Sequence, residues 1–190
     1  AEQRYERTKY EGETAWLSAY QELFNNQSAE TGIYEELAVC SGGAKAGWLG
    51  KSEANDLQWR NVYSENGGEY TMTLAFITGE SRNVKIQVND EEVQTLSLNS
   101  GGWSTLATIE VDVTMKKGNN IIRLSNASAW MPDIDCMDIV PKGSLDLYKH
   151  QLEAAQGKLS MLLEKELPLA VKGALEEAIS ETQNIEPDKD

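Results

Sequence analysis

The fold of this chain is decided by the segment NGGEYTMTLAF at residues 66–76, in which an Asn-Gly-Gly turn precedes an alternating run of apolar and polar residues. The apolar residues recur at every second position: Tyr70, Met72, Leu74 and Phe76. A period of two is that of a β-strand with one buried face. The same alternation returns at residues 84–88 and 109–115, so we expect strands through most of residues 66–140.

Segments rich in glycine and asparagine separate these alternating runs. They are NGG at 66–68, NDEE at 89–92, NSGG at 99–102 and KGNN at 117–120. Glycine and asparagine tolerate the positive φ that tight turns need, and strands of this spacing are typical of a two-sheet all-β domain. We therefore predict a mainly β fold, an antiparallel β-sandwich. Residues 13–24 leave two alternatives open, a short helix or an irregular strand and loop.

The hydrophobic pattern changes its period after Pro141-Lys142-Gly143. Apolar residues then recur at steps of three and four: Leu145, Tyr148, Leu152, Ala155, Leu159 and Leu162. This is the pattern of an amphipathic helix with Ser144 as its N-cap, and Pro168 either ends this helix or opens a second one. We predict a helical hairpin, and hence a sandwich domain at residues 1–142 and a helical appendage or linker at 143–190.

Composition and charge exclude several classes of function. The 190 residues include 17 Lys and Arg against 31 Asp and Glu, a formal net charge of -14. Such a chain repels nucleic acid phosphates and anionic membranes, so we expect neither as a partner. Its apolar runs fall short of the roughly 20 residues that cross a bilayer, and no basic-then-apolar signal segment opens the chain.

Motifs of catalysis are missing from the sequence. His150 is the single histidine and lies on a predicted helix. Asp133 and Asp135 are neighbours on one predicted strand, a placement that seldom flanks a glycosidic bond. We expect no enzyme activity. Cys40 and Cys136 match no zinc or redox spacing, and they are either two buried thiols or a disulfide.

Acidic residues near the two ends of the predicted sandwich suggest a cation. Glu11 and Glu13 project from one face, roughly 7 Å apart, if their stretch is extended. Asp135 and Asp138 belong to the last predicted strand, which could run beside the first. Calcium takes such carboxylates together with backbone carbonyls, but acidic residues on a solvated strand face are also common. Spacing alone leaves both interpretations open, a calcium site and a solvated acidic strand face.

Five tryptophans fall into two groups. Trp48, Trp103 and Trp130 each lie in a segment with Gly, Ser or Pro, where an aromatic ring either plugs the core or offers a flat apolar platform for the face of a sugar ring. Trp16 and Trp59 have the surroundings of packing residues, and we expect both to be buried.

An ordered series of short motifs over residues 8–141 resembles the carbohydrate-binding modules of families 35 and 6. The series is YEGE at 10–13, CSGG at 40–43, GWLG at 47–50, GEYT at 68–71, VN at 88–89, GGWST at 101–105, KGNN at 117–120, IRL at 122–124 and PDID at 132–135. The resemblance implies a jelly-roll sandwich with a structural Ca²⁺ held by Glu11, Glu13 and Asp135. It also implies a sugar site in the loops at one end, faced by Trp48 and Trp103.

This sequence departs from the family at one position of the implied sugar site. Asp133 stands where the family often has an asparagine that hydrogen-bonds the sugar. A carboxylate there disfavours uronic acids, so we expect neutral sugars of galactosyl or xylosyl type. Asn126 and Trp130 in the neighbouring loop are further candidates for sugar contact.

The resemblance implies a non-catalytic module that targets a parent glycoside-active enzyme or surface protein to an oligo- or polysaccharide. A catalytic domain of the same chain is then a partner, and the protein is secreted, periplasmic or on the cell surface. The rival hypothesis is a structural domain that has lost its sugar site, in which Trp48 and Trp103 would be buried under side chains or loops.

Overall fold

The computed structural model describes residues 8–20, 31–143, 152–158, 160 and 169–183. Thr8–Ile139 form one compact unit, and the residues that follow belong to another unit. The predicted division between residues 142 and 143 stays a prediction.

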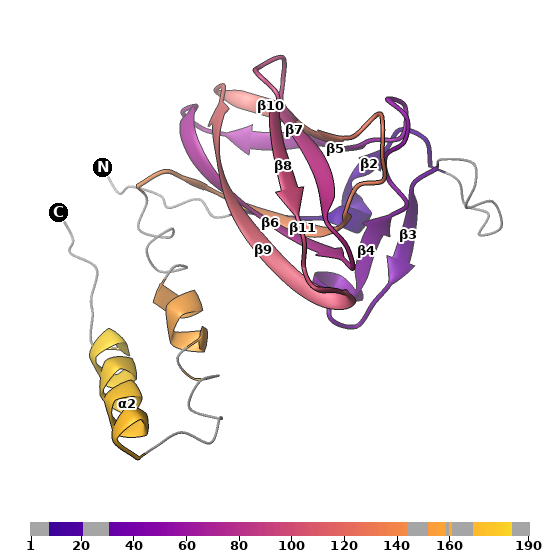
Figure 1. Ribbon diagram of the computed structural model, residues 1–190. Helices are drawn as coiled ribbons and strands as arrows, with labels where there is room; N and C mark the ends of the chain where they lie inside the picture. Colours follow the sequence, from indigo (N-terminus) through magenta and orange to yellow (C-terminus); the bar gives the residue numbers. More distant parts are fainter. Residues whose placement is uncertain (1–7, 21–30, 144–151, 159, 161–168, 184–190) are drawn as a thin grey trace. The chain divides into compact units, whose positions relative to one another are not determined.

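Two antiparallel sheets face each other in the compact unit (Figure 1). The first sheet runs in the order β3-β4-β11-β6-β9, with β1 also paired to β11, and consists of β1 (Thr8–Glu11), β3 (Ile33–Glu36), β4 (Ala44–Gly47), β6 (Gly68–Thr78), β9 (Gly102–Met115) and β11 (Asp133–Pro141). The second runs β2-β5-β10-β7-β8 and consists of β2 (Trp16–Leu17), β5 (Leu57–Ser64), β7 (Arg82–Val88), β8 (Gln94–Leu98) and β10 (Gly118–Ser125). The predicted jelly-roll β-sandwich is confirmed.

The alternating segment at residues 70–76 lies in β6, whose long antiparallel pairing with β9 sets the register of the first sheet. Tyr70 faces Val113 and Met72 faces Val111, so the apolar sets of both strands fall on the same face. That face is buried and belongs to a single hydrophobic core. Burial of such side chains contributes about 1.5 to 3 kcal/mol each, which makes this face the main source of stability.

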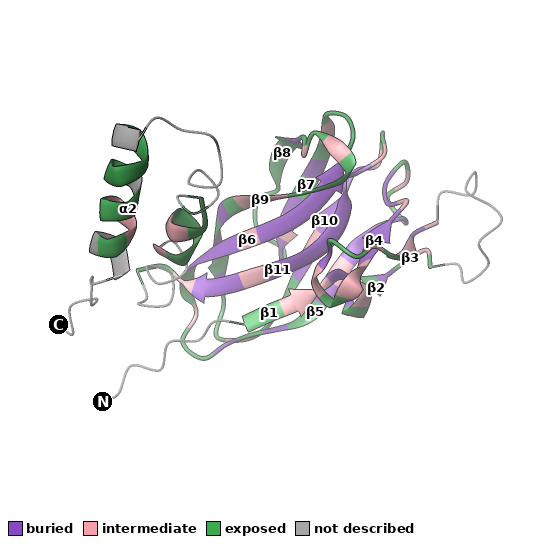
Figure 2. Cartoon of the chain, turned by 90° about the horizontal axis from the view of Figure 1, so that it is seen from below, coloured by how far each residue is buried: buried purple, intermediate pink, exposed green. Residues whose placement is uncertain are grey.

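Buried residues are concentrated on β6 and β11 (Figure 2). Trp59 on β5 belongs to the core as predicted, and its indole N–H donates to the backbone oxygen of Glu11 at 3.0 Å. The expected burial of Trp16 is wrong, since this ring is 52% exposed and lies under the guanidinium of Arg60. Trp16 occupies β2 at the edge of the second sheet, where its outward register position against Gln58 leaves it on the surface.

The beginning of the sandwich joins its end. Strand β1 pairs antiparallel with β11, with Glu11 opposite Cys136, as the acidic residues of both segments led us to expect. A 3₁₀ turn, η1 (Gly12–Thr14), follows β1, so the stretch after Glu13 is a turn and the short strand β2. Residues 21–24 of the undecided segment lie outside the described residues.

The C-terminal unit begins with the last residues of β11 and a turn, and its described residues after 151 are helical. Residues 152–158 are helical, and α2 (Leu169–Gln183) begins directly after Pro168. Ser144 and the connection at 161–168 lie outside the described residues, so the hairpin itself stays a prediction. Within the described chain, no helix has the length and apolar character to span a bilayer.

Asn120 at the start of β10 fixes one corner of the sandwich. The side chain is fully buried, and its amide donates to the backbone oxygens of Val62, Lys116 and Gly118. Its carbonyl oxygen accepts from the Lys116 N–H and from the Asn89 amide. One side chain therefore ties the turn before β10 to β5 and to the β7–β8 connection.

We predict that Asn120→Ala lowers the free energy of unfolding by about 2 to 4 kcal/mol, because it leaves several buried backbone groups without hydrogen-bond partners. The exposed neighbour provides the control: Asn119→Ala changes it by less than about 0.5 kcal/mol. Urea unfolding followed by tryptophan fluorescence measures both. Equal effects at the two positions would contradict this account of Asn120.

Candidate functional site

Two of the predicted aromatic residues meet at one end of the sandwich. Trp48 follows β4 and Trp130 precedes β11, and their rings lie edge to face with centroids 5.6 Å apart at 90°. The backbone of Gly50 pairs with that of Trp130 in an isolated antiparallel bridge. The ammonium of Lys51 lies 4.7 Å from the Trp130 ring centroid, a cation–π contact. Both rings are half-buried.

The loop that carries Trp48 holds an uncommon backbone conformation. Trp48 and Lys51 have φ of 58° and 61°, which non-glycine residues rarely adopt. Leu49 between them is fully buried, and the buried Asn55 amide donates to the backbone oxygens of Trp48 at 2.8 Å and Gly50 at 3.0 Å. The anchored leucine and these hydrogen bonds keep the Trp48 ring turned away from the core.

Asn126 shapes the neighbouring loop. Its side-chain oxygen accepts hydrogen bonds from the N–H and hydroxyl of Ser128 and from the Ala129 N–H. Its amide donates to the backbone oxygen of Asn83 at 3.0 Å. Both ends of the amide are used within the protein, so the structure gives Asn126 a part in holding the Trp130 loop.

Trp103 lies at the start of β9 and is 48% exposed. The guanidinium carbon of Arg82 lies 4.5 Å from its ring centroid. Gly79 permits this placement, since a β-carbon there would collide with the indole. Arg82 also donates to the backbone oxygen of Met131 at 3.0 Å and to Glu80 at 2.8 Å. Through Arg82, Trp103 is connected to the residue next to Trp130.

Asp133 belongs to a buried chain of charges that ends at Trp48. The Lys45 ammonium bonds to Asp133 and lies 3.1 Å from the Glu35 carboxylate, which accepts from the Trp48 indole N–H at 3.3 Å. Burial raises the pKa of Asp133, and the hydrogen bond from Lys45 opposes the rise. Burial acts to lower the pKa of Lys45, but its bonds to Asp133 and Glu35 outweigh this and raise it.

Sequence reasoning missed Lys45, Glu35 and Arg82. Lys45 carried a partial signal, because a lysine between Ala44 and Ala46, directly before the GWLG motif, is out of place in an otherwise apolar strand. Its partner is set by tertiary pairing, since β4 meets β11 at Ala46 and Ile134. Spacing along the chain does not reveal that contact.

Two of the three predicted metal ligands, Glu11 and Asp135, come together in a second cluster with oxygens within 4.8 Å of each other, and Glu13 borders this cluster beside Gly42. Glu11 ends β1, Glu13 lies in η1 and Asp135 lies in β11. Each has one carboxylate oxygen that is buried and has no hydrogen-bond partner: Glu11 Oε2, Glu13 Oε2 and Asp135 Oδ1. Leaving a buried carboxylate oxygen unmatched is costly, so these atoms fit a bound cation.

The turn η2 (Ser41–Gly43) packs against this carboxylate cluster. The Ser41 hydroxyl donates to Glu11 Oε1 at 2.8 Å and accepts from the Lys9 ammonium at 2.7 Å. Gly42 has φ of 64°, and a β-carbon on it would lie 2.5 Å from Glu13 Oε1. Burial raises the pKa of Asp135, a Ser41 backbone hydrogen bond lowers it, and the nearby Glu11 charge raises it. The cluster therefore concentrates negative charge beside η2.

Cys40 and Cys136 are free thiols, both buried. Burial and neighbouring carboxylates, Asp135 first, raise the pKa of Cys40 to about 11 and that of Cys136 to about 12. Of the two alternatives open from the sequence, the structure shows buried thiols.

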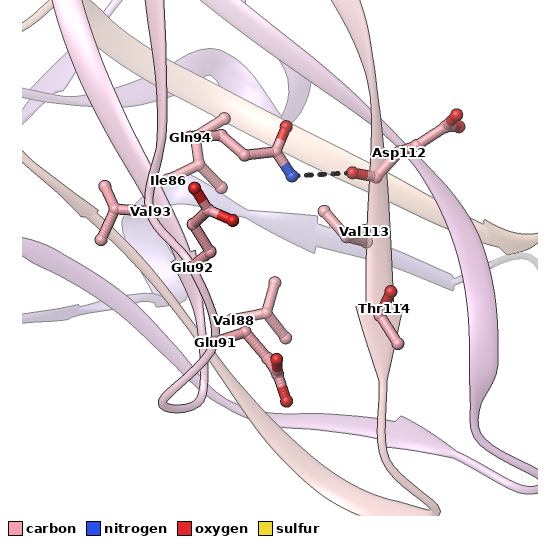
Figure 3. A pocket seen from close by; sticks show the side chains of 9 residues that line it. All are labelled: Ile86, Val88, Glu91, Glu92, Val93, Gln94, Asp112, Val113 and Thr114. Carbon is pink, nitrogen blue, oxygen red and sulfur yellow. Dashed lines mark hydrogen bonds between the residues drawn. The ribbon is translucent and has the colours of Figure 1, made fainter.

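A separate pocket opens between β8 and β9, about 30 Å along β9 from Trp103 (Figure 3). Figure 3 shows an apolar floor that includes Ile86, Val88 and Val113, with Glu91 and Glu92 at the rim. None of its nine lining residues is aromatic, so this pocket offers no ring for sugar stacking. The tryptophan-bearing loops remain the candidate binding site.

The fold and these loops define a β-sandwich binding module. No family model matches the chain. Endo-1,4-beta-xylanase B and Alpha-L-arabinofuranosidase C of Cellvibrio japonicus are each 33% identical over 85 residues, which is 42% of this chain and only 14% of each relative.

Solved structures match over a larger part of the chain. A family 35 carbohydrate-binding module from Clostridium thermocellum is 30% identical, with 70% of this chain and 98% of the module covered and a TM-score of 0.62. An exo-beta-1,3-galactanase from Phanerochaete chrysosporium, solved with beta-1,3-galactotriose, is 25% identical, with 70% of this chain and 29% of the galactanase covered and a TM-score of 0.59. The chain belongs to family 35 of the carbohydrate-binding modules.

We predict that Lys45→Met lowers the free energy of unfolding at neutral pH by about 3 to 5 kcal/mol, because it leaves the buried Asp133 carboxylate without its cation. The pKa of Asp133 then rises further, so the folded state takes up a proton more readily than the unfolded state. Stability therefore recovers as the pH falls. Urea unfolding at neutral and mildly acidic pH measures the effect.

Two variants serve as controls for this prediction. Lys85→Met removes an exposed lysine and should change stability by less than about 0.5 kcal/mol. Adding Asp133→Asn to Lys45→Met removes the stranded charge and should restore most of the loss at neutral pH. A loss that does not depend on pH, or that the second substitution does not relieve, would show that Lys45 matters for packing alone.

Proposed function

We propose that the sandwich binds a polysaccharide built of neutral sugars, without cleaving it, in the loops that carry Trp48, Trp103 and Trp130. The observation that carries the proposal is Trp103, which is held half-exposed between Gly79 and Arg82. Burying this ring in the core would have been favourable, so its fixed exposure supports a role in contact with a ligand.

The chemistry of this site suits a pyranose ring. A tryptophan face binds the C–H face of a sugar, and charged groups beside it bind hydroxyls. Lys51 and Glu35 lie in contact with the two neighbouring tryptophans, Trp130 and Trp48. Because Asp133 is already bonded to Lys45, that lysine does not offer an unshared positive charge to an acidic sugar. Lys51 and Arg82 also lie against the rings, so the choice of neutral sugars rests on the similar proteins.

The similar proteins support neutral sugars of xylosyl or galactosyl type. Their names specify a xylanase, an arabinofuranosidase and a galactanase solved with galactotriose. Each is longer than the matched part, which supports a targeting module attached to a catalytic domain of a secreted or cell-surface protein. Asp133 and Asp135 serve an ion pair and a carboxylate cluster, an arrangement unlike two carboxylates that flank a substrate.

The rival hypothesis, a structural domain without a sugar site, requires Trp48 and Trp103 to be covered. Trp103 is half-exposed, which speaks for binding. Trp48 contacts the edge of Trp130 and is half-buried, so the distinction rests on Trp103.

We predict that Trp103→Ala weakens glycan binding by at least about thirtyfold, the effect of losing about 2 kcal/mol at a central aromatic contact. Trp16→Ala is the matched control, since it removes an equally exposed tryptophan that also lies against an arginine. Affinity gel electrophoresis against xylan, arabinan, galactan and mannan identifies the target, and calorimetry gives the affinities.

Thermal unfolding accompanies these assays to show that each variant is folded. Retardation by one glycan that is lost in Trp103→Ala and kept in Trp16→Ala is the expected result. No retardation of the folded wild type by any glycan would favour the structural-domain hypothesis. Unchanged binding by Trp103→Ala would place the sugar site elsewhere.

We further propose that Glu11, Glu13 and Asp135 hold a structural Ca²⁺. Their three unmatched buried oxygens support a hard cation with oxygen ligands. A bound ion would neutralise charge where β1, η1 and β11 meet, and so would fasten the beginning of the sandwich to its end.

We predict that a chelator lowers the melting temperature by about 5 to 11 °C, because an ion at one hundred times its dissociation constant contributes about 2.7 kcal/mol. Glu13→Gln should show a smaller difference between calcium and chelator. Glu65→Gln changes the same charge at an exposed position and should behave as the wild type. Differential scanning calorimetry measures all three, and a wild type that is indifferent to calcium would contradict the proposal.

A further inference from the structure

One of the two thiols lies within the carboxylate cluster. Cys136 Sγ, a Glu11 oxygen and an Asp135 oxygen all lie within 4.8 Å of one another. Register explains the contact, because Glu11 on β1 is the direct partner of Cys136 on β11. The thiol donates weakly to Asp135 Oδ2 at 3.7 Å. Sulfur and oxygen donors from two strands therefore converge on one point.

Gly12 allows the two strands to come this close. A β-carbon at position 12 would lie 2.6 Å from the backbone oxygen of Asp135 and 2.5 Å from that of Ile134. Any larger residue would force the beginning of η1 away from β11. The close approach thus belongs to the backbone itself and does not depend on one side-chain rotamer.

Two carboxylate oxygens of this cluster are buried without a hydrogen-bond partner, which packing alone does not explain. Asp135 is 1% exposed, yet its Oδ1 has no hydrogen-bond partner, and the same holds for the buried Glu11 Oε2. The Cys136 thiol and a Ser41 backbone hydrogen bond serve Asp135, and Lys9 lies 3.9 Å from Glu11 Oε1, but none of these contacts reaches Asp135 Oδ1 or Glu11 Oε2. Buried carboxylate oxygens without partners are costly, and a bound cation would compensate them.

The chemical nature of the donor atoms determines which cation such a site prefers. Calcium binds oxygen and has little affinity for sulfur, whereas a thiolate selects softer ions such as Zn²⁺ and Cd²⁺. We propose that Glu11, Asp135 and Cys136 form a mixed oxygen–sulfur site that binds a thiophilic divalent ion, in competition with the Ca²⁺ proposed above. This inference rests on that cation site and adds a sulfur ligand to it.

Binding requires only small movements. Zn–O distances of about 2.0 Å and Zn–S distances of about 2.3 Å put tetrahedral ligand atoms roughly 3.5 Å apart. The three ligand atoms, which lie within 4.8 Å of one another, would therefore approach one another by about 1 Å to bind Zn²⁺. The larger Cd²⁺ would require a smaller approach. The sulfur binds as thiolate, and its proton passes to the solvent.

Cadmium is the better probe, because a thiolate bound to Cd²⁺ gives an ultraviolet charge-transfer band that oxygen ligands do not give. The full chain is titrated with Cd²⁺ as wild type, Cys136→Ser and Cys40→Ser. Cys40 is the matched control: it is also a buried free thiol, but the cluster found among the described residues does not include it. Each variant is also melted with calcium and with chelator.

The wild type and Cys40→Ser should show the band, saturating at one Cd²⁺ per chain. Cys136→Ser should lose the band and bind Cd²⁺ at least tenfold more weakly, while it keeps the calcium-dependent rise in melting temperature. Excess Ca²⁺ should suppress the band of the wild type, because both ions need Glu11 and Asp135. The suppression by Ca²⁺ is measured on the wild type alone, so it does not depend on whether a variant folds.

A band that persists in Cys136→Ser, that disappears in Cys40→Ser, or that excess Ca²⁺ leaves unchanged would overturn the proposal. A wild type that is stabilised by calcium but gives no band with Cd²⁺ would remove the sulfur ligand and keep the calcium site. A wild type that responds to neither ion would remove both.

Discussion

Nearly every side chain of β11 is buried, and three parts of the protein depend on this one strand. Ile134, Met137 and Ile139 contribute to the core between the sheets. Asp133 at the beginning of the strand reaches the tryptophan-bearing loops, and Asp135 with Cys136 reaches the carboxylate cluster. Since β11 lies between β4 and β6 and also pairs with β1, moving it would disturb the fold and both candidate sites together.

A buried strand that carries aspartates must compensate their charge, and β11 does so differently at its two acidic positions. At Asp133 the protein supplies its own cation, Lys45 from the neighbouring β4. At Asp135 the described residues supply hydrogen bonds from Ser41 and a thiol, which leaves charge for an ion from solution. The first arrangement needs no metal, while at the second the proposed Ca²⁺ would make stability depend on the ions present.

The loops of the candidate binding site are held in place by contacts within the protein. Leu49 and Asn55 fix the turn that presents Trp48, and Asn126 fixes the loop before Trp130. Arg82 ties Trp103 to the backbone of Met131. Rings held in place in this way would lose little entropy on binding, which favours the sugar site proposed for these loops.

The sequence by itself determined the sandwich and the tryptophans and acidic residues of both candidate sites, but not Lys45, Glu35 or Arg82. Alternation at Tyr70, Met72 and Leu74 has one physical meaning, a strand with one buried face, and the turns between strands carry glycine and asparagine for equally local reasons. Only the tertiary structure decided that Asp133 bonds to Lys45, that Cys136 joins the carboxylates, and that Trp16 lies exposed on an edge strand. These facts depend on which strands become neighbours and in what register, and that is set by packing between residues far apart in the chain.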